Sequence, residues 1–222
     1  MISTHGLQYA YPDGPAFTFS DVSVPSGATL LVRGKSGAGK STWLSLLAGL
    51  RTPDEGEITV AGQVLGELSG PARDRWRASN VGFLPQKLHL SDALTVRRNL
   101  ELVFYAAGVP VNAKALRHAV DLLGVAHLAG RRPSQLSGGE AQRVGLARSI
   151  LMQPKVIFAD EPTASLDDDA ATAGLRLLQG CAAECEATLV IATHDRRLRE
   201  AMPGALVYYL STAMADRQDV PA

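Results

Sequence analysis

A glycine-rich loop carries the clearest chemical signal in the sequence. Residues 34–41 read Gly-Lys-Ser-Gly-Ala-Gly-Lys-Ser and fit the pattern G-x-x-x-x-G-K-[ST]. Glycines let several backbone N–H groups face one anion, and a following helix adds its positive N-terminal end. Lys40 would reach the β- and γ-phosphates of a nucleotide, the Ser41 hydroxyl would ligate Mg²⁺, and Thr42 would offer another donor. The predicted phosphate-binding residues are Gly34, Ser36, Gly37, Ala38, Gly39, Lys40, Ser41 and Thr42.

The alternative for this loop is a glycine-rich turn that binds nothing. Its surroundings argue against that alternative, because the loop follows a short apolar run at 29–32 and opens a helical pattern from Ser41 to about Leu50. A strand before the loop and a helix after it are the context that the pattern requires. The sequence therefore predicts a nucleotide site.

An apolar run that ends in two carboxylates is the second signal. Residues 156–159 are Val-Ile-Phe-Ala, and Asp160 and Glu161 follow them. In a protein with a phosphate-binding loop, this is the position of the aspartate that organises Mg²⁺. We expect Asp160 to hold Mg²⁺ through water and Glu161 to act as the base that polarises the attacking water. Taken alone, the pattern is more often a solvated charge pair at a strand end.

A third signal lies at residues 136–140, Leu-Ser-Gly-Gly-Glu. Ser137 is a good helix N-cap, and the two glycines after it expose backbone amides at the start of a helix that runs to about Met152. The segment is a second candidate anion site, placed away from the first. On its own it would be a capped helix start more often than a phosphate site.

The segments around these motifs indicate the elements that position them. Strands are expected at 7–11 and 17–24 around a turn at 12–15, and then at 29–32, 58–60, 156–159, 188–192 and 205–210. Short apolar runs without alternation are typical of strands buried on both faces. The sequence predicts an α/β fold, with a P-loop NTPase core and an N-terminal antiparallel β subdomain.

From residue 87 to about 143 the apolar residues recur at helical spacing. They fall into two sets, separated by Gly108-Val109-Pro110: Leu100, Val103, Phe104 and Ala107, then Leu116, Val120 and Leu123. We interpret this stretch as an α-helical subdomain inserted into a single domain that spans 1–222. The core would cover about 1–86 and 144–210, and the polar tail at 211–222 would fray.

Composition excludes several classes of protein. The 222 residues are 46% hydrophobic and 20% charged, which is ordinary for a globular domain with a sizeable core. Twenty-two basic and 22 acidic residues give a formal net charge of zero, so nothing attracts nucleic acid in general. The apolar stretches are shorter than the roughly 18 residues of a membrane span, and the first residues do not resemble a signal peptide. We expect neither a secreted nor an integral membrane protein, although docking on a membrane protein stays open.

Two smaller features have ordinary explanations. Cys181 and Cys185 lie four apart on one expected helix face, and we expect two reduced core residues rather than a disulfide or a metal site. A basic cluster beside Trp76 either contacts phosphate or forms a solvated helix edge with Asp74. Its members are Arg73, Arg75 and Arg77.

In this order, the motifs resemble the nucleotide-binding subunit of ABC transporters over about residues 2–210. The resemblance identifies 34–41 as the Walker A loop, 136–140 as the signature motif, and Asp160 with Glu161 as the Walker B motif. It adds Tyr11 as the aromatic residue that stacks on adenine, Gln86 as the Q-loop glutamine, 165–167 as the D-loop and His194 as the switch histidine. Taken singly, Tyr11 could be turn packing, His194 a strand end, and Asp167 a solvated helix start.

The resemblance implies ATP and Mg²⁺ as ligands and assigns roles to these positions. The catalytic residues would be Glu161, His194 and Gln86. Mg²⁺ would contact Ser41, Gln86 and Asp160. Beyond the Walker A loop and Tyr11, the nucleotide would contact Ser137, Gly138, Gly139 and Asp167.

The resemblance also implies a mechanism that needs partners. Two such domains pair head to tail, and each ATP lies between the Walker A loop of one and the signature motif of the other. ATP closes the dimer, hydrolysis opens it, and integral membrane permease subunits receive the motion. We expect a homodimer, no nucleic-acid partner, and a location in the cytoplasm at the inner face of the cell membrane. Partner-facing positions would include Leu88, His89 and Leu90, which could equally be subdomain core.

A narrower resemblance concerns the kind of work. Residues 90–100, 106–110 and 159–163 look like those of the lipoprotein-releasing, macrolide-export and cell-division group of ABC ATPases. Export or lipoprotein and envelope work is therefore expected. The main alternative is a soluble ABC-type ATPase that acts on nucleic acid or ribosomes, and a second is a scaffold that binds nucleotide without hydrolysis. The latter predicts a missing lysine or base, whereas Lys40 and Glu161 are both present.

Overall fold

Two five-stranded sheets form the framework of the chain in the computed structural model, which describes residues 1–164, 166–195 and 197–210. The first sheet is antiparallel and comprises β1 (Ile2–Ala10), β2 (Ala16–Thr18), β3 (Val22–Val24), β5 (Glu55–Val60) and β6 (Gln63–Val64). The second is parallel, in the order β10 (Leu206–Tyr209), β4 (Thr29–Arg33), β9 (Thr188–Thr193), β8 (Val156–Asp160) and β7 (Val81–Leu84). The predicted α/β class is confirmed.

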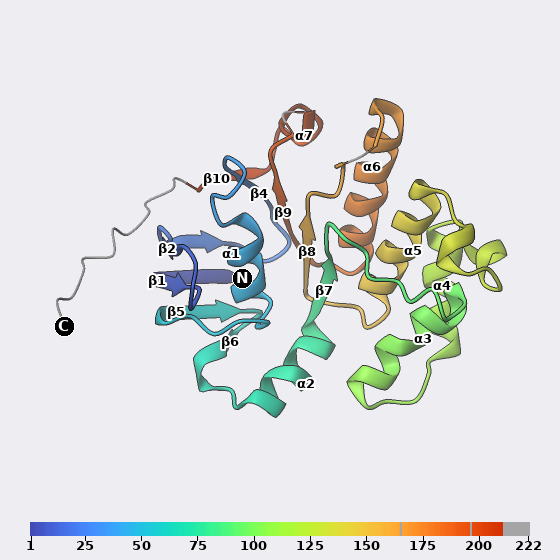
Figure 1. The fold of residues 1–222 in the computed structure, drawn as a ribbon, viewed down its shortest axis with the longest axis horizontal. Coiled ribbons are helices and arrows are strands. Elements are labelled where there is room, and N and C mark those ends of the chain that lie inside the picture. Colours follow the sequence, from blue (N-terminus) through green and yellow to red (C-terminus); the bar gives the residue numbers. More distant parts are fainter. Residues whose placement is uncertain (165, 196, 211–222) are drawn as a thin grey trace.

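Helices cover the parallel sheet, and Figure 1 shows α3 to α6 on the side opposite the antiparallel sheet and α1. The α-helices are α1 (Lys40–Leu47), α2 (Gly70–Asn80), α3 (Val96–Ala107), α4 (Ala113–Leu122), α5 (Gly138–Ile150), α6 (Asp168–Glu184) and α7 (Arg197–Ala201). Short 3₁₀ turns lie at Leu65–Glu67, Ala126–Leu128 and Pro133–Gln135. No helix within the described ranges is long and apolar enough to cross a membrane.

The parallel sheet separates two hydrophobic cores. Along β4, Leu30 and Val32 pack toward α1 and the antiparallel sheet, whereas Leu31 packs toward the helices of the other side. The same alternation runs through β8 and β9, whose residues are all buried. This is why these strands read as unbroken apolar runs, since both faces need apolar side chains.

The predicted strand at 17–24 is wrong as a single element. It is two strands, β2 and β3, that pair with different parts of β1. The register of β1 shifts between His5 and Gln8, and Gly6 there has a φ of +57°. The irregularity divides β1 into two pairing segments, so its neighbour divides as well.

The helical stretch from residue 87 contains α3, α4 and the start of α5, and Gly108 ends α3 in a left-handed cap with φ +69°. For α2, the sequence indicates only the solvated helix edge considered for the cluster of Arg73, Arg75 and Arg77, and no pattern predicts the strand β7. Residues 211–222, for which fraying is predicted, lie outside the described residues.

The cysteines behave as predicted. Both thiols are free; Cys181 is buried, and Cys185 is partly buried at the end of α6. Burial raises the pKa of Cys181 to about 12 and that of Cys185 to about 11. Such thiols stay protonated and unreactive at neutral pH.

β7 and α5 pack closely at Gly82, which has no side chain. A substitution at this position tests the contribution of that packing to stability. A Cβ at this position would lie 2.3 Å from the backbone oxygen of Ser149 and 3.0 Å from Pro154 Cγ. We expect Gly82→Ala to lower the free energy of unfolding by about 2 kcal/mol, measured by urea denaturation, because backbone must move to admit the methyl group. Gly180→Ala in α6 is the matched control: apart from its chain neighbours and the backbone of its own helix, no described atom lies within 4 Å of its added Cβ. It should raise stability by roughly 0.5–1 kcal/mol, and equal effects of the two substitutions would contradict this account.

Candidate nucleotide site

The phosphate-binding loop joins the end of β4 to the start of α1. Gly37 and Gly39 have φ angles of +79° and +90°, a region that favours glycine. A Cβ on Gly39 would lie 2.7 Å from Phe17 Cδ1, so this position also has no space for a side chain. Gly39 is the N-cap of α1 and no side chain bonds to the cap. The first turn of α1 therefore presents its amides to an anion.

Lys40 points back across this loop. Its ammonium donates to the carbonyl oxygens of Gly34 at 3.1 Å and Lys35 at 3.3 Å. It also lies 3.4 Å from Glu161 Oε1 in an ion pair whose side chains are only 8% and 10% exposed. The cation is thus held by acceptors inside the loop.

Glu161 joins the ends of β8 and β9. Its N–H donates to the Ala192 carbonyl oxygen at 2.8 Å. Its Oε1 lies 2.8 Å from His194 Nδ1, and its Oε2 accepts from the His194 backbone N–H at 3.3 Å. Glu161 has a φ of +47°, and non-glycine residues in this region are uncommon and cluster at functional sites.

Asp160 is buried beside the loop with an incomplete set of partners. Its carboxyl group hydrogen-bonds to Ser41, while Oδ1 has no hydrogen-bond partner among the described residues. Burial raises the pKa of Asp160 from its ordinary value, and the bond to Ser41 opposes this. An orphaned carboxylate oxygen next to a hydroxyl is a donor set that suits Mg²⁺. The residues present therefore fit the expected metal.

Most of these groups surround one cavity of about 550 Å³, although Asp160, Gly34 and Ala38 do not line it. It is lined by Pro15, Phe17, Ser36, Gly37, Gly39, Lys40, Ser41, Thr42, Gln86, Glu161 and His194. The structure thus brings the loop, Gln86, Glu161 and His194 together from four separate parts of the chain. Tyr11 does not line the cavity but adjoins it, since its hydroxyl lies 3.0 Å from Thr42 Oγ1.

The signature motif and Asp167 do not reach this cavity. Ser137 caps α5, accepts from Glu140 N–H at 3.2 Å and donates its own N–H to Glu140 Oε2 at 2.8 Å. The bond from Ser137 N–H lowers the pKa of Glu140. Asp167 caps α6 by accepting from Ala170 N–H at 2.8 Å. Ser165, part of the predicted D-loop, lies outside the described residues.

Two sets of residues at the site have no signal in the sequence. Pro15 and Phe17 line the cavity, although no motif marks them. Arg197 pairs with Asp195, one residue beyond His194, and Asp195 also accepts from the Thr163 hydroxyl at 2.9 Å. The Arg197 bonds lower the pKa of Asp195 to about 2, so the carboxylate stays charged and fixes the segment that carries His194.

Comparison with known proteins identifies the family. A family model described as "ABC transporter" matches residues 18–164 of the chain. The chain belongs to the ABC transporter family. It is an ATP-binding and ATP-hydrolysing subunit of the ABC type.

Relatives of this ABC ATPase include lipoprotein-releasing system ATP-binding proteins. The chain is 37% identical over 201 residues to LolD of Psychrobacter arcticus, covering 89% of this chain and 83% of the relative. It is 38% identical over 205 residues to LolD of Xanthomonas oryzae pv. oryzae, with 89% and 84% covered.

Solved structures of ABC cassettes have the same fold. The dimeric post-hydrolysis structure of the ATP-binding cassette MJ0796 with ADP and Pi superposes with a TM-score of 0.83 at 28% identity, over 95% of this chain and 94% of that one. CbiO1 from Clostridium perfringens, part of the ABC transporter complex cbiONQ, superposes with a TM-score of 0.80 at 26% identity, over 95% and 84%.

Asp160 should stabilise the folded chain less than a neutral side chain would. The pKa of Asp160 is higher in the folded chain than in the unfolded chain. The free energy of unfolding therefore falls as the pH rises from the unfolded-state pKa through the folded-state pKa. We therefore expect Asp160→Asn to raise the free energy of unfolding at pH 7, without Mg²⁺ or nucleotide, by roughly 1 kcal/mol. Exposed Asp121→Asn on α4 is the control and should stay within about 0.5 kcal/mol. A loss of stability in Asp160→Asn would show that the buried charge is compensated.

Proposed function

We propose that this ABC ATPase drives lipoprotein release or related envelope work through a membrane subunit, with Glu161 as the catalytic base. The observation that carries the catalytic part is the position of Glu161, whose carboxylate contacts Lys40 and His194 inside the cavity. The kinship to lipoprotein-releasing ATPases supports the kind of work. Arg73 and Arg77 donate to Thr52, Leu68, Gly49 and Asp74 within the chain, which disfavours the nucleic-acid alternative.

Hydrolysis needs the groups of this cavity in complementary roles. ATP phosphates would take the place of the acceptors that now hold Lys40, and the freed Glu161 would accept a proton from the attacking water. His194, hydrogen-bonded to Glu161, would orient that carboxylate and the γ-phosphate. Gln86 also lines the cavity and would contact the water and the metal site.

Mg²⁺ would be held by the Ser41 hydroxyl, by Asp160 through water, and by Gln86. When bound, it neutralises phosphate charge as the leaving group departs. The orphaned Asp160 Oδ1 supports this assignment.

The catalytic unit would be a dimer of this chain. Ser137, Gly138 and Gly139 begin α5 with exposed or partly exposed positions, yet they do not line the cavity of their own chain. A helix N-terminus with two glycines can bind phosphate if a second copy presents it. The cassette MJ0796 is dimeric in its solved structures, and Asp167 at the start of α6 would join the same interface.

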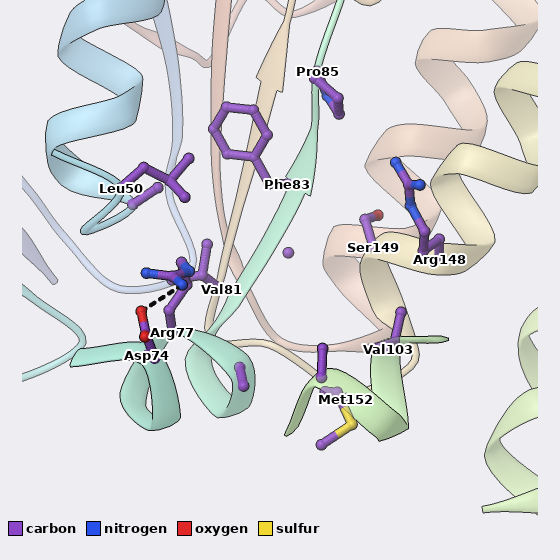
Figure 2. A pocket seen from close by; sticks show the side chains of 14 residues that line it. Leu50, Asp74, Arg77, Val81, Phe83, Pro85, Val103, Arg148, Ser149 and Met152 are labelled. Atoms are coloured by element: carbon purple, nitrogen blue, oxygen red, sulfur yellow. Dashed lines mark hydrogen bonds and ion pairs between the residues drawn. The ribbon is translucent and has the colours of Figure 1, made fainter. Parts of the chain in front are cut away.

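A second cavity, of about 490 Å³, is the proposed seat of the membrane subunit. Figure 2 shows its walls: Leu50 after α1, Val81 and Phe83 of β7, Val103 of α3, and Met152 after α5. Pro85 lines this cavity while the next residue, Gln86, lines the nucleotide cavity. A segment seated here would therefore touch the strand end that carries Gln86.

The charged groups of this second cavity indicate the chemistry of a segment that would fit it. Asp74 and Arg77 line the cavity and pair with each other. Arg148 also lines it and donates to the carbonyl oxygens of Leu88 and His89, but within the described ranges it forms no ion pair with a carboxylate. Burial lowers the pKa of Arg148. An amphipathic segment with apolar residues and one carboxylate is complementary to it.

Leu88 and Leu90 pack against the core, which favours the core alternative for them, whereas His89 is exposed.

Glu161→Gln tests the catalytic proposal. The amide cannot accept the proton, so ATP hydrolysis should fall at least about 100-fold. ATP binding should persist, because loss of the ion pair leaves Lys40 free for phosphate, and a dimer should accumulate with ATP. Phosphate release, equilibrium ATP binding and size-exclusion chromatography measure the three quantities. Exposed Glu200→Gln on α7 is the control with unchanged turnover, and wild-type turnover in Glu161→Gln would remove Glu161 as the base.

Co-purification tests the partner. Tagged Glu161→Gln chain with ATP and Mg²⁺, isolated from detergent-solubilised membranes, should bring a multi-span membrane protein identified by mass spectrometry. Adding Leu50→Asp should reduce its yield at least about tenfold, since Leu50 is exposed at the second cavity. Leu122→Asp, an exposed leucine of α4, is the matched control that should retain it. Ribosomes or a soluble partner with nothing from the membrane would instead favour the soluble alternative.

A further inference from the structure

Tyr11 is held by several neighbours at the edge of the nucleotide cavity. Its hydroxyl bonds to Thr42 of α1, and the rings of Tyr9 and Phe17 meet it at 88° and 76°, with centroids 5.0 and 6.3 Å away. Perpendicular neighbours of this kind fix the plane of an aromatic ring. Tyr11 thus has backbone hydrogen bonds within the turn, to Gly14 and Pro15, and is also anchored to the helix that follows the phosphate-binding loop.

Arg51 covers one face of this ring. Its guanidinium carbon lies 4.8 Å from the centre of the Tyr11 ring and 5.5 Å from that of Tyr9, and Nη1 donates to the Tyr9 hydroxyl at 2.7 Å. The N–H of Arg51 bonds to the carbonyl oxygen of Ser45, two residues before α1 ends. One helix thus presents Lys40 to the phosphates at its start and delivers Arg51 to Tyr11 just beyond its end.

The loop around Arg51 does not need the guanidinium to keep its shape. Asp54 accepts from Ala10 N–H at 2.7 Å and donates its own N–H to Gln8. Arg73 fastens Thr52 at 2.6 Å. Arg51 is itself exposed, so it contributes little to the core. Its specific contacts are with the two tyrosine rings.

We propose that Arg51 is a positioning residue for the nucleotide base. By covering one face of Tyr11 and holding the ring through a cation–π contact, it leaves the opposite face as a preorganised platform for the adenine ring. The inference rests on the proposed role of Tyr11 in base stacking. In this role Arg51 contributes to the affinity for the base and does not contribute to the affinity for the phosphates.

The test compares a ligand that has a base with one that lacks it. ATP and inorganic tripolyphosphate are titrated into the intact chain in EDTA, so that neither is turned over, and both dissociation constants are measured by calorimetry. Arg51→Ala should weaken ATP binding about two- to fivefold, the range of an exposed cation–π contact, and leave tripolyphosphate binding unchanged. Arg51→Lys, which keeps the cation, should recover part of the loss.

Two controls separate this proposal from the proposed function. Arg73→Ala removes a neighbouring guanidinium that fastens the same loop without touching Tyr11, and it should leave the ratio of the two dissociation constants unchanged. Tyr11→Ala should weaken ATP at least about fivefold relative to tripolyphosphate, and adding Arg51→Ala to it should have no further effect.

Each contrary outcome has a distinct meaning. Equal weakening of both ligands by Arg51→Ala, or unchanged or tighter ATP binding, overturns the role of Arg51 while the Tyr11 result stands. An unchanged ratio in Tyr11→Ala overturns base stacking on Tyr11, and with it the platform on which this inference rests. Catalysis by Glu161 is tested independently of either result.

Discussion

The register of three neighbouring parallel strands determines where this site can form. Arg33 at the end of β4 pairs with Thr193 of β9, and Ala192 of β9 pairs with Asp160 of β8. The phosphate-binding loop, His194 and Glu161 therefore leave the sheet at one edge and within reach of each other. Because the strands are buried on both faces, a slip by one residue would exchange the side chains that pack in the two cores, and the close packing of each core opposes such an exchange. Core packing thus protects the catalytic geometry.

The charged groups of the site satisfy one another only in part. Lys40 is held by two carbonyl oxygens and by Glu161, which occupy the role that phosphate oxygens would take. Burial raises the pKa of Asp160, whose Oδ1 has no hydrogen-bond partner in the part of the chain that the structure describes, and the backbone of Glu161 has a left-handed φ. These features cost stability, and they concentrate at the cavity, as expected where function selects against the most stable arrangement.

The sequence alone predicted the residues whose types and spacing carry chemistry. The loop at 34–41, the Asp160-Glu161 pair and the buried strands are local patterns, and the folded chain has them as expected. The sequence did not predict features whose position depends on how segments pair in the folded chain. The β1 irregularity divides a strand that looks continuous, β7 is a four-residue strand with a glycine inside it, and α2 has no buried residue to create periodicity. Phe17 and Arg51 reach the site from segments without any motif, so only the fold connects them to Gly39 and Tyr11.

Helix α5 connects the signature motif with the segment that follows Gln86. It begins at the signature motif, and near its other end Arg148 holds the carbonyl oxygens of Leu88 and His89, just after Gln86. One turn earlier, Gly145 lets Leu88 approach so closely that a Cβ would lie 2.7 Å from Leu88 Cδ2. Packing and hydrogen bonds therefore join the segment after Gln86 to α5. A displacement of Gln86 by bound nucleotide would then be carried to Ser137, the residue proposed to complete the site of a second copy.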